Sequence, residues 1–260
     1  MAQTDAGVFP ERRTAVLTGA GSVRGIGRAT AERLAASGWS IAILDLDGDA
    51  AAEAARLIAE EHGVESLGVQ VDVADEASVD AAITRVEGAL PPVVALVNLA
   101  GISSPTTFLE TTVAEWDRVH AINLRGAFIE TRRLVPGMIE RRLGRIVSLS
   151  SISAQRGGGS YSKVAYSSSK AALLGFTRAL AREVGEFGIT MNAVAPGPID
   201  TDIMGGTLDD DRKQALAQGI LVGRIGTRDE VGALIAFLVG PDAGFITAAT
   251  YDINGGLQVS

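Results

Sequence analysis

The chain has 260 residues, 47% of them hydrophobic, a length that suits a single α/β domain with a sizeable buried core. It contains no cysteine, which excludes disulfide scaffolds, thiolate metal sites and cysteine nucleophiles. Its 23 basic and 31 acidic residues give a formal net charge of −8, which disfavours nucleic acid as a partner.

The chain begins with a polar segment, residues 1–13, that carries acidic side chains and no apolar stretch. We expect it to form a flexible tail and not a secretory signal. No later run approaches the roughly 20 apolar residues that span a bilayer, so we expect a cytoplasmic protein without a membrane partner. The two histidines, His62 and His120, are too few for a histidine metal site, and no metal is expected.

Short apolar runs alternate with longer helical patterns along the rest of the chain. Strands are predicted at 14–18, 40–45, 66–71, 93–98, 145–150, 189–195 and 248–253, and helices at 25–37, 49–61, 75–87, 113–142, 161–186 and 229–239. Nearly continuous apolar strands separated by helices predict a doubly wound, mostly parallel seven-stranded sheet with helices on both faces. We expect one domain over 14–260, with a flexible lid at about 198–228, where no strand is predicted.

A glycine-rich turn follows the first strand and opens the first helix. It contains Gly19, Gly21, Gly25 and Gly27, with Ile26 between the last two. Glycines in a strand–turn–helix context let backbone N–H groups approach a pyrophosphate, which the helix N-terminus also favours. This turn therefore predicts a dinucleotide-binding site.

Two charged residues bear on the choice between NAD and NADP. Asp45 ends the second strand, where an acidic residue is expected to bind the adenosine ribose hydroxyls and to repel a 2′-phosphate. Arg24, just before Gly25, is the opposing signal, because an arginine there could pair with a 2′-phosphate. We expect the carboxylate to prevail and predict NAD, with NADP as the alternative.

Further residues at strand ends are candidates for the cofactor side. Asp72 and Val73 follow the third strand and are placed to meet the adenine. Asn98, Ala100 and Gly101 end the fourth strand, and small residues there would let a cofactor lie on the sheet edge. A purely structural hydrogen bond is the alternative for Asn98.

A tyrosine and a lysine carry the main chemical signal. Tyr166 and Lys170 are four positions apart in a predicted helix and so share one face. A nearby ammonium favours the phenolate, which would make Tyr166 a usable acid/base for alcohol–ketone interconversion. The preceding strand delivers hydroxyl groups, including Ser151, at its carboxyl end, and Asn123 lies unusually inside a helical pattern.

Together these motifs resemble the short-chain dehydrogenase/reductase family over nearly the whole chain. The resemblance rests on Thr18-Gly19, Gly25-Ile26-Gly27, Asn98-Leu99-Ala100-Gly101, Asn123, Ser151, Tyr166 with Lys170, and Pro196-Gly197 with Thr201. It implies a Rossmann-type fold and NAD(P)-dependent interconversion of a secondary alcohol and a ketone.

The resemblance also implies a role for individual residues. Tyr166 would be the acid/base, Lys170 would lower its pKa and hold the nicotinamide ribose, Ser151 would hold the substrate oxygen and Asn123 would support a proton-relay water. The nicotinamide would lie against a segment that follows the sixth strand, at Pro196, Gly197, Ile199 and Thr201.

This sequence departs from the family pattern at four places. The glycine turn is two residues longer, Leu99 replaces a usual asparagine, and Ala248-Ala249 stands where a glycine with a polar partner is usual. The interval from Ser151 to Tyr166 is also about two residues longer, so Ser153 would fit by spacing alone, whereas the strand pattern favours Ser151. The positions expected to set substrate specificity are Ser153, Gln155, Tyr161 and Met204.

Two alternatives to a general alcohol dehydrogenase stay open. One is an NADPH-dependent 3-oxoacyl-thioester reductase, for which arginines 132, 133, 141 and 142 could form a docking patch for an acidic carrier protein. The other is a non-catalytic dinucleotide-binding scaffold. The resemblance further implies a homotetramer, or a homodimer, for which Ala171, Ala172, Gly175 and Ala179 would permit close helix packing.

Overall fold

The computed structural model describes residues 9–159, 161–204, 206 and 208–259, without the side chain of Met204. Seven strands form one sheet in the order β3-β2-β1-β4-β5-β6-β7, and every neighbouring pair is parallel. The strands are β1 (Thr14–Thr18), β2 (Ser40–Asp45), β3 (Ser66–Gln70), β4 (Val93–Asn98), β5 (Gly144–Leu149), β6 (Ile189–Pro196) and β7 (Thr250–Ile253). This arrangement confirms the doubly wound α/β fold.

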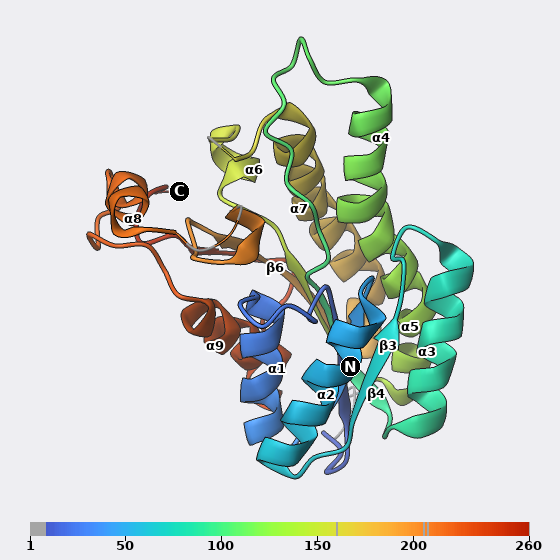
Figure 1. Ribbon diagram of the computed structural model, residues 1–260. Helices are drawn as coiled ribbons and strands as arrows, with labels where there is room; N and C mark the ends of the chain where they lie inside the picture. The colour runs from blue at the N-terminus through green and yellow to red at the C-terminus, as the bar shows by residue number, and fades with distance from the viewer. Residues whose placement is uncertain (1–8, 160, 205, 207, 260) are drawn as a thin grey trace.

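Helices connect the strands and cover both faces of the sheet (Figure 1). They are α1 (Ile26–Ala36), α2 (Gly48–His62), α3 (Glu76–Ala89), α4 (Val113–His120), α5 (Ala127–Arg141), α6 (Ser153–Arg156), α7 (Val164–Val184), α8 (Asp210–Ala217) and α9 (Arg228–Val239). Among the described residues, none of these helices has the length and apolar character needed to cross a membrane.

Two hydrophobic cores lie on opposite faces of the sheet. One joins the strands to α1, α2 and α9, with Leu34, Ile58 and Ile235 fully buried. The other joins them to α3, α5 and α7, with Ile83 and Met138 fully buried. Strands covered on both faces have no polar side to expose, which explains their nearly continuous apolar sequences.

The strand order reverses between β1 and β4, whose helices leave toward opposite faces. A crevice forms outside the carboxyl ends of the strands at such a point, and ligands of open α/β sheets bind there. The ends of β1, β4, β5 and β6 therefore place their following loops around one site.

The structure refines two predicted helices. The stretch predicted at 113–142 is interrupted by a π-helical segment, Ala121–Gly126, between α4 and α5. The helix predicted from residue 161 begins at Val164, so Tyr161 precedes it, and the short helix α6 lies upstream. Gly157 and Gly158 separate α6 from α7 with positive φ angles of 82° and 122°, a conformation that favours glycine.

Residues 9–13, expected within a loose tail, pack against the body of the domain. The Phe9 ring meets the Trp39 ring edge-on at 5.8 Å between centroids, and the Arg13 guanidinium lies 4.7 Å from the Trp39 ring centroid. The expectation of a tail for residues 1–8 concerns residues outside the described part of the chain.

Candidate active site

The glycine turn links the end of β1 to the start of α1. Gly19 has a φ of 63°, and a Cβ there would lie 2.7 Å from the Cα of Ala100, so the turn and the end of β4 touch backbone to backbone. Helix α1 follows Gly25 without a capping side chain and without an acidic residue in its first turn. Its first N–H groups therefore face an environment suited to an anion.

Asp45 lies beside this turn, as the sequence predicted. Its Oδ2 accepts a 2.8 Å hydrogen bond from the Gly21 N–H, and its Oδ1 accepts one of 3.1 Å from the Asp47 N–H. A Cβ on Gly21 would lie 3.1 Å from this carboxyl group, so any larger residue there would require the Asp45 side chain to shift. The half-buried carboxylate thus combines a structural bond to the turn with a negative charge at the crevice.

Arg24, the signal for NADP in the sequence, is paired with two carboxylates in the structure. Its Nη2 lies 2.6 Å from Asp200 Oδ1 and its Nε 3.1 Å from Asp202 Oδ1. Two carboxylates from the segment after β6 therefore neutralise the guanidinium. An arginine already paired twice offers little net attraction to a further anion.

Tyr166 and Lys170 lie on one face of α7, where Lys170 is buried and Tyr166 is half-buried. Burial raises the pKa of the Tyr166 phenol, and a hydrogen bond with the Ser151 side chain opposes that rise. The Lys170 Nζ lies 5.8 Å from the Tyr166 ring centroid and donates a 2.7 Å hydrogen bond to the Leu149 carbonyl. Burial lowers the pKa of Lys170 to about 8.

In the structure without a bound dinucleotide, burial and the Ser151 contact are the two influences on the pKa of Tyr166. The net shift of the Tyr166 pKa is upward, because removing the phenolate from water outweighs the hydrogen bond with Ser151.

Ser151 and Ser153, the two candidates for the catalytic serine, have different hydrogen-bond partners. The Ser151 side chain hydrogen-bonds Tyr166 and accepts a 3.1 Å bond from the Ser153 N–H. The Ser153 hydroxyl instead pairs with the Ser162 hydroxyl at 2.8 Å. Ser151 thus faces the tyrosine, whereas Ser153 ties α6 to the loop before α7.

Asn123 occupies the π-helical segment, a local geometry that often occurs at functional sites. Its Nδ2 donates to the Ile102 carbonyl and to the Ser169 hydroxyl, both at 3.0 Å, and its Oδ1 accepts from the Ile102 N–H at 2.8 Å. A Cβ on Gly101 would lie 3.2 Å from Asn123 Oδ1 and 3.3 Å from Lys170 Nζ. Asn123 and Lys170 therefore converge on the loop after β4.

Of the other residues predicted to contact the cofactor, Asp72 lies on the surface, whereas Val73 and Asn98 are buried. Asp72 is exposed and accepts a 2.9 Å bond from the Ala74 N–H, while Val73 is buried against Gly126 of the π-helical segment. Asn98 is buried, and its amide donates to Thr131 and Ser148. The Asn98 side chain thus makes the structural hydrogen bonds that were the alternative to cofactor binding.

The segment after β6 contains the residues expected near a nicotinamide. Pro196 ends the strand, and the Gly197 N–H donates a 3.0 Å hydrogen bond to the Ile253 carbonyl of β7. Ile199 is buried and forms an isolated bridge with Gly226, and the Thr201 side chain is buried nearby in the chain. Neighbouring backbone thus fixes this segment at both of its ends.

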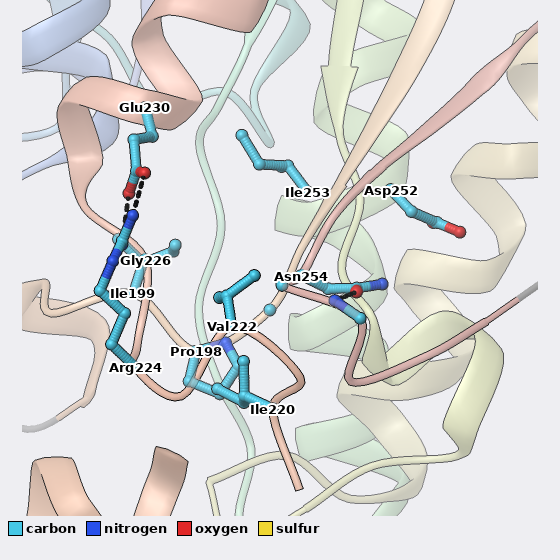
Figure 2. Close-up of a pocket in the computed structure, with 13 residues that line it drawn as sticks. Pro198, Ile199, Ile220, Val222, Arg224, Gly226, Glu230, Asp252, Ile253 and Asn254 are labelled. Carbon is cyan, nitrogen blue, oxygen red and sulfur yellow. Dashed lines mark hydrogen bonds and ion pairs between the residues drawn. The ribbon is translucent and has the colours of Figure 1, made fainter.

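A cavity of about 320 Å³ lies on the β7 side of this segment. Figure 2 shows Pro198, Ile199, Ile220 and Val222 along it, with the Arg224–Glu230 ion pair at one end. Tyr166 does not line it. It is therefore separate from the tyrosine–lysine pair.

The four expected specificity residues have different surroundings. The Gln155 amide donates a 2.8 Å bond to Asp252 of β7, and Ser153 is paired as described. The Tyr161 hydroxyl is hydrogen-bonded by Arg212 of α8. The side chain of Met204 lies outside the described part of the chain. Among the three of these side chains that the structure describes, Tyr161 is the one that contacts α8.

Sequence reasoning missed Glu130, a buried acid of α5 that is 1% exposed. Its Oε2 lies 3.3 Å from the Thr18 hydroxyl, which also accepts weak bonds from the Leu99 and Ala100 N–H groups. Burial raises the pKa of Glu130 to about 8, and the Thr18 bond opposes the rise. The only available signal was its place one turn from Ala127 on the buried face of a long helix.

Comparison with known proteins shows which sequences this chain resembles. The sequence profile of a family described as Enoyl-(Acyl carrier protein) reductase matches residues 19–258. An uncharacterized short-chain type dehydrogenase/reductase of Sinorhizobium fredii is 40% identical over 95% of this chain and 98% of its own. A 3-oxoacyl-[acyl-carrier-protein] reductase of Aquifex aeolicus is 38% identical over 91% of this chain and 94% of its own. An acetoacetyl-CoA reductase of Allochromatium vinosum is 36% identical over 94% and 98%.

These similarities extend over nearly the whole chain and agree with the parallel sheet, the glycine turn and the tyrosine–lysine pair. The chain belongs to the short-chain dehydrogenase/reductase family and is an NAD(P)-dependent oxidoreductase of CH–OH and ketone groups.

Proposed function

We propose that the chain is an NAD-dependent oxidoreductase that interconverts a secondary alcohol and a ketone, with Tyr166 as acid/base. The observation that carries the proposal is the meeting of Ser151, Tyr166 and Lys170 at the carboxyl ends of the strands. Asn123 belongs to the same site as a positioning residue, because its amide holds the loop after β4 against α7.

The residues at the crevice fit a dinucleotide. The uncapped start of α1 provides N–H groups for a pyrophosphate, and Gly19, Gly21 and Gly25 keep the backbone accessible. When bound, the nicotinamide supplies hydride transfer, while the protein positions the reactants and handles the proton. Lys170 and the residues Pro196, Gly197, Ile199 and Thr201 are proposed to hold the nicotinamide half.

Asp45 supports NAD over NADP. Its carboxylate retains lone pairs for ribose hydroxyls after accepting from Gly21 and Asp47, and it would repel a 2′-phosphate. Arg24, which could have offset that repulsion, is paired with Asp200 and Asp202. Both observations favour a cofactor without the additional phosphate.

Tyr166 handles the proton at the substrate oxygen. Because burial raises its pKa, the phenol carries a proton that it can donate to a ketone oxygen as the carbon receives a hydride. The Ser151 hydroxyl, adjacent to the phenol, is placed to hold the same oxygen. In the oxidative direction the phenol must first lose its proton, so alcohol oxidation is favoured by higher pH.

Reduction of 3-oxoacyl thioesters is a second candidate, favoured by the names of the Aquifex and Allochromatium relatives. A carrier-protein docking patch at the four α5-region arginines receives no support. Arg132 pairs with Glu76, Arg133 with Asp80 and Glu87, and arginines 141 and 142 bond backbone carbonyls. Free acyl-CoA thioesters are therefore the appropriate first test of this class.

We also propose a homo-oligomer, a tetramer or a dimer, that uses the outer face of α7. Gly175 is exposed with open space around it, and Ala179 is exposed one turn later. Phe128 of α5 is 46% exposed and meets Phe176 edge-on beside this face. Within each subunit, we propose a single domain over residues 14–260, in which residues 198–228 form the flexible lid.

The experiment is nicotinamide absorbance with NAD and NADP, oxidised and reduced, across secondary alcohols, ketones, sugars and 3-oxoacyl-CoA thioesters. We expect turnover with NAD that is lost in Tyr166→Phe. Turnover only with NADP would refute the cofactor assignment. A Tyr166→Phe variant that kept full turnover would refute the assignment of the acid/base, and tight NADH binding without turnover would favour the scaffold alternative.

A further inference from the structure

The glycine turn reaches toward the segment 198–228, here called the cover. Val23, near the tip of the turn, is 69% exposed, and Arg228 at the start of α9 donates a hydrogen bond to its carbonyl. The turn thus meets a residue 205 positions later in the chain, in addition to its proposed role at a pyrophosphate.

Charged contacts join the turn to the first part of the cover. Arg24 binds Asp200 at 2.6 Å and Asp202 at 3.1 Å, and the Ser22 hydroxyl donates to Asp202 at 2.6 Å. Lys213 of α8 approaches the other oxygen of Asp200 at 3.2 Å. A chain of alternating charges therefore runs from the turn through the cover to α8.

The burial of these groups favours a persistent contact. The side chains of Arg24 and Asp200 are 36% and 23% exposed, so their pair is partly shielded from water and salt. A hollow of about 750 Å³ lies beside it, lined by Val23, Arg24 and Asp200 together with residues of α8 and the start of α9. The ion pairs of Arg24 thus lie at the edge of this hollow and join the turn to the cover.

We infer that Arg24 is a positioning residue that latches the cover over the dinucleotide site and so controls how fast the cofactor enters and leaves. The inference rests on the proposed function, because it takes the glycine turn as the NAD site. Ser22, Asp200 and Asp202 complete the latch. The conformation of the turn places Arg24 against these two carboxylates.

The latch has a distinctive kinetic consequence. Since it consists of protein groups alone, it restrains the cover before NAD binds as well as afterwards. Breaking it lowers the barrier for both association and dissociation, and the two effects largely cancel in Kd. An arginine that contacted the cofactor directly would instead change the dissociation rate and Kd together.

The first test is hydrogen exchange of the full-length protein without added cofactor, which does not depend on the proposed function. We expect Arg24→Met to accelerate amide exchange in the peptides that cover residues 198–202 and 208–217 by about three- to tenfold, as for the loss of a few half-exposed ion pairs. Arg85→Met, an exposed arginine of α3, is the matched control. Unchanged exchange in Arg24→Met would overturn the latch.

The second test is stopped-flow NADH fluorescence with the same variants. We expect Arg24→Met to raise the association and dissociation rates of NADH by about three- to tenfold, with Kd changed by less than about twofold. In the unmodified protein, added salt should weaken the ion pairs of Arg24 and so raise both rates. Arg24→Met should remove this effect of salt. An Asp202→Asn change should add little in the Arg24→Met background. A changed Kd with an unchanged association rate would overturn the latch, whereas failure of the unmodified protein to bind NADH would overturn the proposed function.

Discussion

Glu130 provides the strongest quantitative test of the structure, because its environment links protonation to folding. The carboxyl group lies in the interior beneath the ends of β1 and β4, and burial raises its pKa from 4.5 to about 8. Within the described residues, Glu130 Oε1 and Asn98 Oδ1 have no hydrogen-bond partner. A neutral acid tolerates such surroundings far better than a carboxylate does.

The sign of the pH effect follows from where the proton resides. Between pH 4.5 and about 8 the folded protein keeps the Glu130 proton, whereas the unfolded chain releases it. The unfolded state therefore binds fewer protons, and the free energy of unfolding falls as the pH rises through this window. At about 1.4 kcal/mol per pH unit, reduced near the two pKa values, the loss from pH 5 to pH 8 is about 3 kcal/mol.

Glu130→Gln removes the titration and keeps the shape of the neutral acid. We expect the variant to match the unmodified protein within about 1 kcal/mol at pH 5 and to exceed its stability by about 3 kcal/mol at pH 8. The measurement is urea unfolding at both pH values and at one protein concentration, since any oligomer would make stability concentration-dependent.

Glu140→Gln is the matched control, because Glu140 is exposed near the end of the same helix. Its stability difference from the unmodified protein should stay within about 0.5 kcal/mol at both pH values. An equal effect of Glu130→Gln at pH 5 and pH 8 would refute the reasoning, because it would mean that Glu130 is not held protonated in the folded state.

Three further predictions concern the site and the assembly. Ser151→Ala should lower kcat by about a hundredfold or more, while Ser153→Ala changes it by less than about tenfold, and steady-state kinetics with equal effects would contradict the partner assignment. Asp45→Ala should lower the ratio of kcat/KM for NAD over NADP by at least about tenfold, because a like-charge repulsion is removed; an unchanged ratio would show that Asp45 does not face the adenosine ribose. Gly175→Arg should shift the protein to a smaller species in light scattering, since a long side chain would enter a close helix contact, and an unaltered mass would exclude this face as the interface.

The sequence predicted the sheet and most helix positions because those signals are local. Apolar runs of strand length and helical periodicity identified six strands to within one residue at each end, and the seventh, β7, began two residues later than expected. The helix that carries Tyr166 and Lys170 was also predicted, and their spacing of four positions put both on one face whatever the surrounding contacts. Asp45 was found in the same way, through its fixed place after β2 and the glycine turn.

Other features depended on partners that no local pattern identifies. The π-helical turn at Asn123 is stabilised by contacts to Ile102 and Ser169, and spacing alone left Ser151 and Ser153 as alternatives until their neighbours were known. The contacts of Asn123 and of the two serines join residues far apart in the chain, so no helical or strand periodicity predicts them.

Charge was the least predictable property of the site. Arg24 looked like a phosphate ligand in the sequence, but the fold brings it to Asp200, 176 positions away. Burial by α5 raises the pKa of Glu130, and burial in α7 raises that of Tyr166 and lowers that of Lys170. The sequence by itself thus determined the fold and the candidate reacting groups, through patterns of hydrophobicity and spacing. Only the tertiary structure decided their charges and partners, because electrostatic energy depends on distance and burial in space and not on separation along the chain.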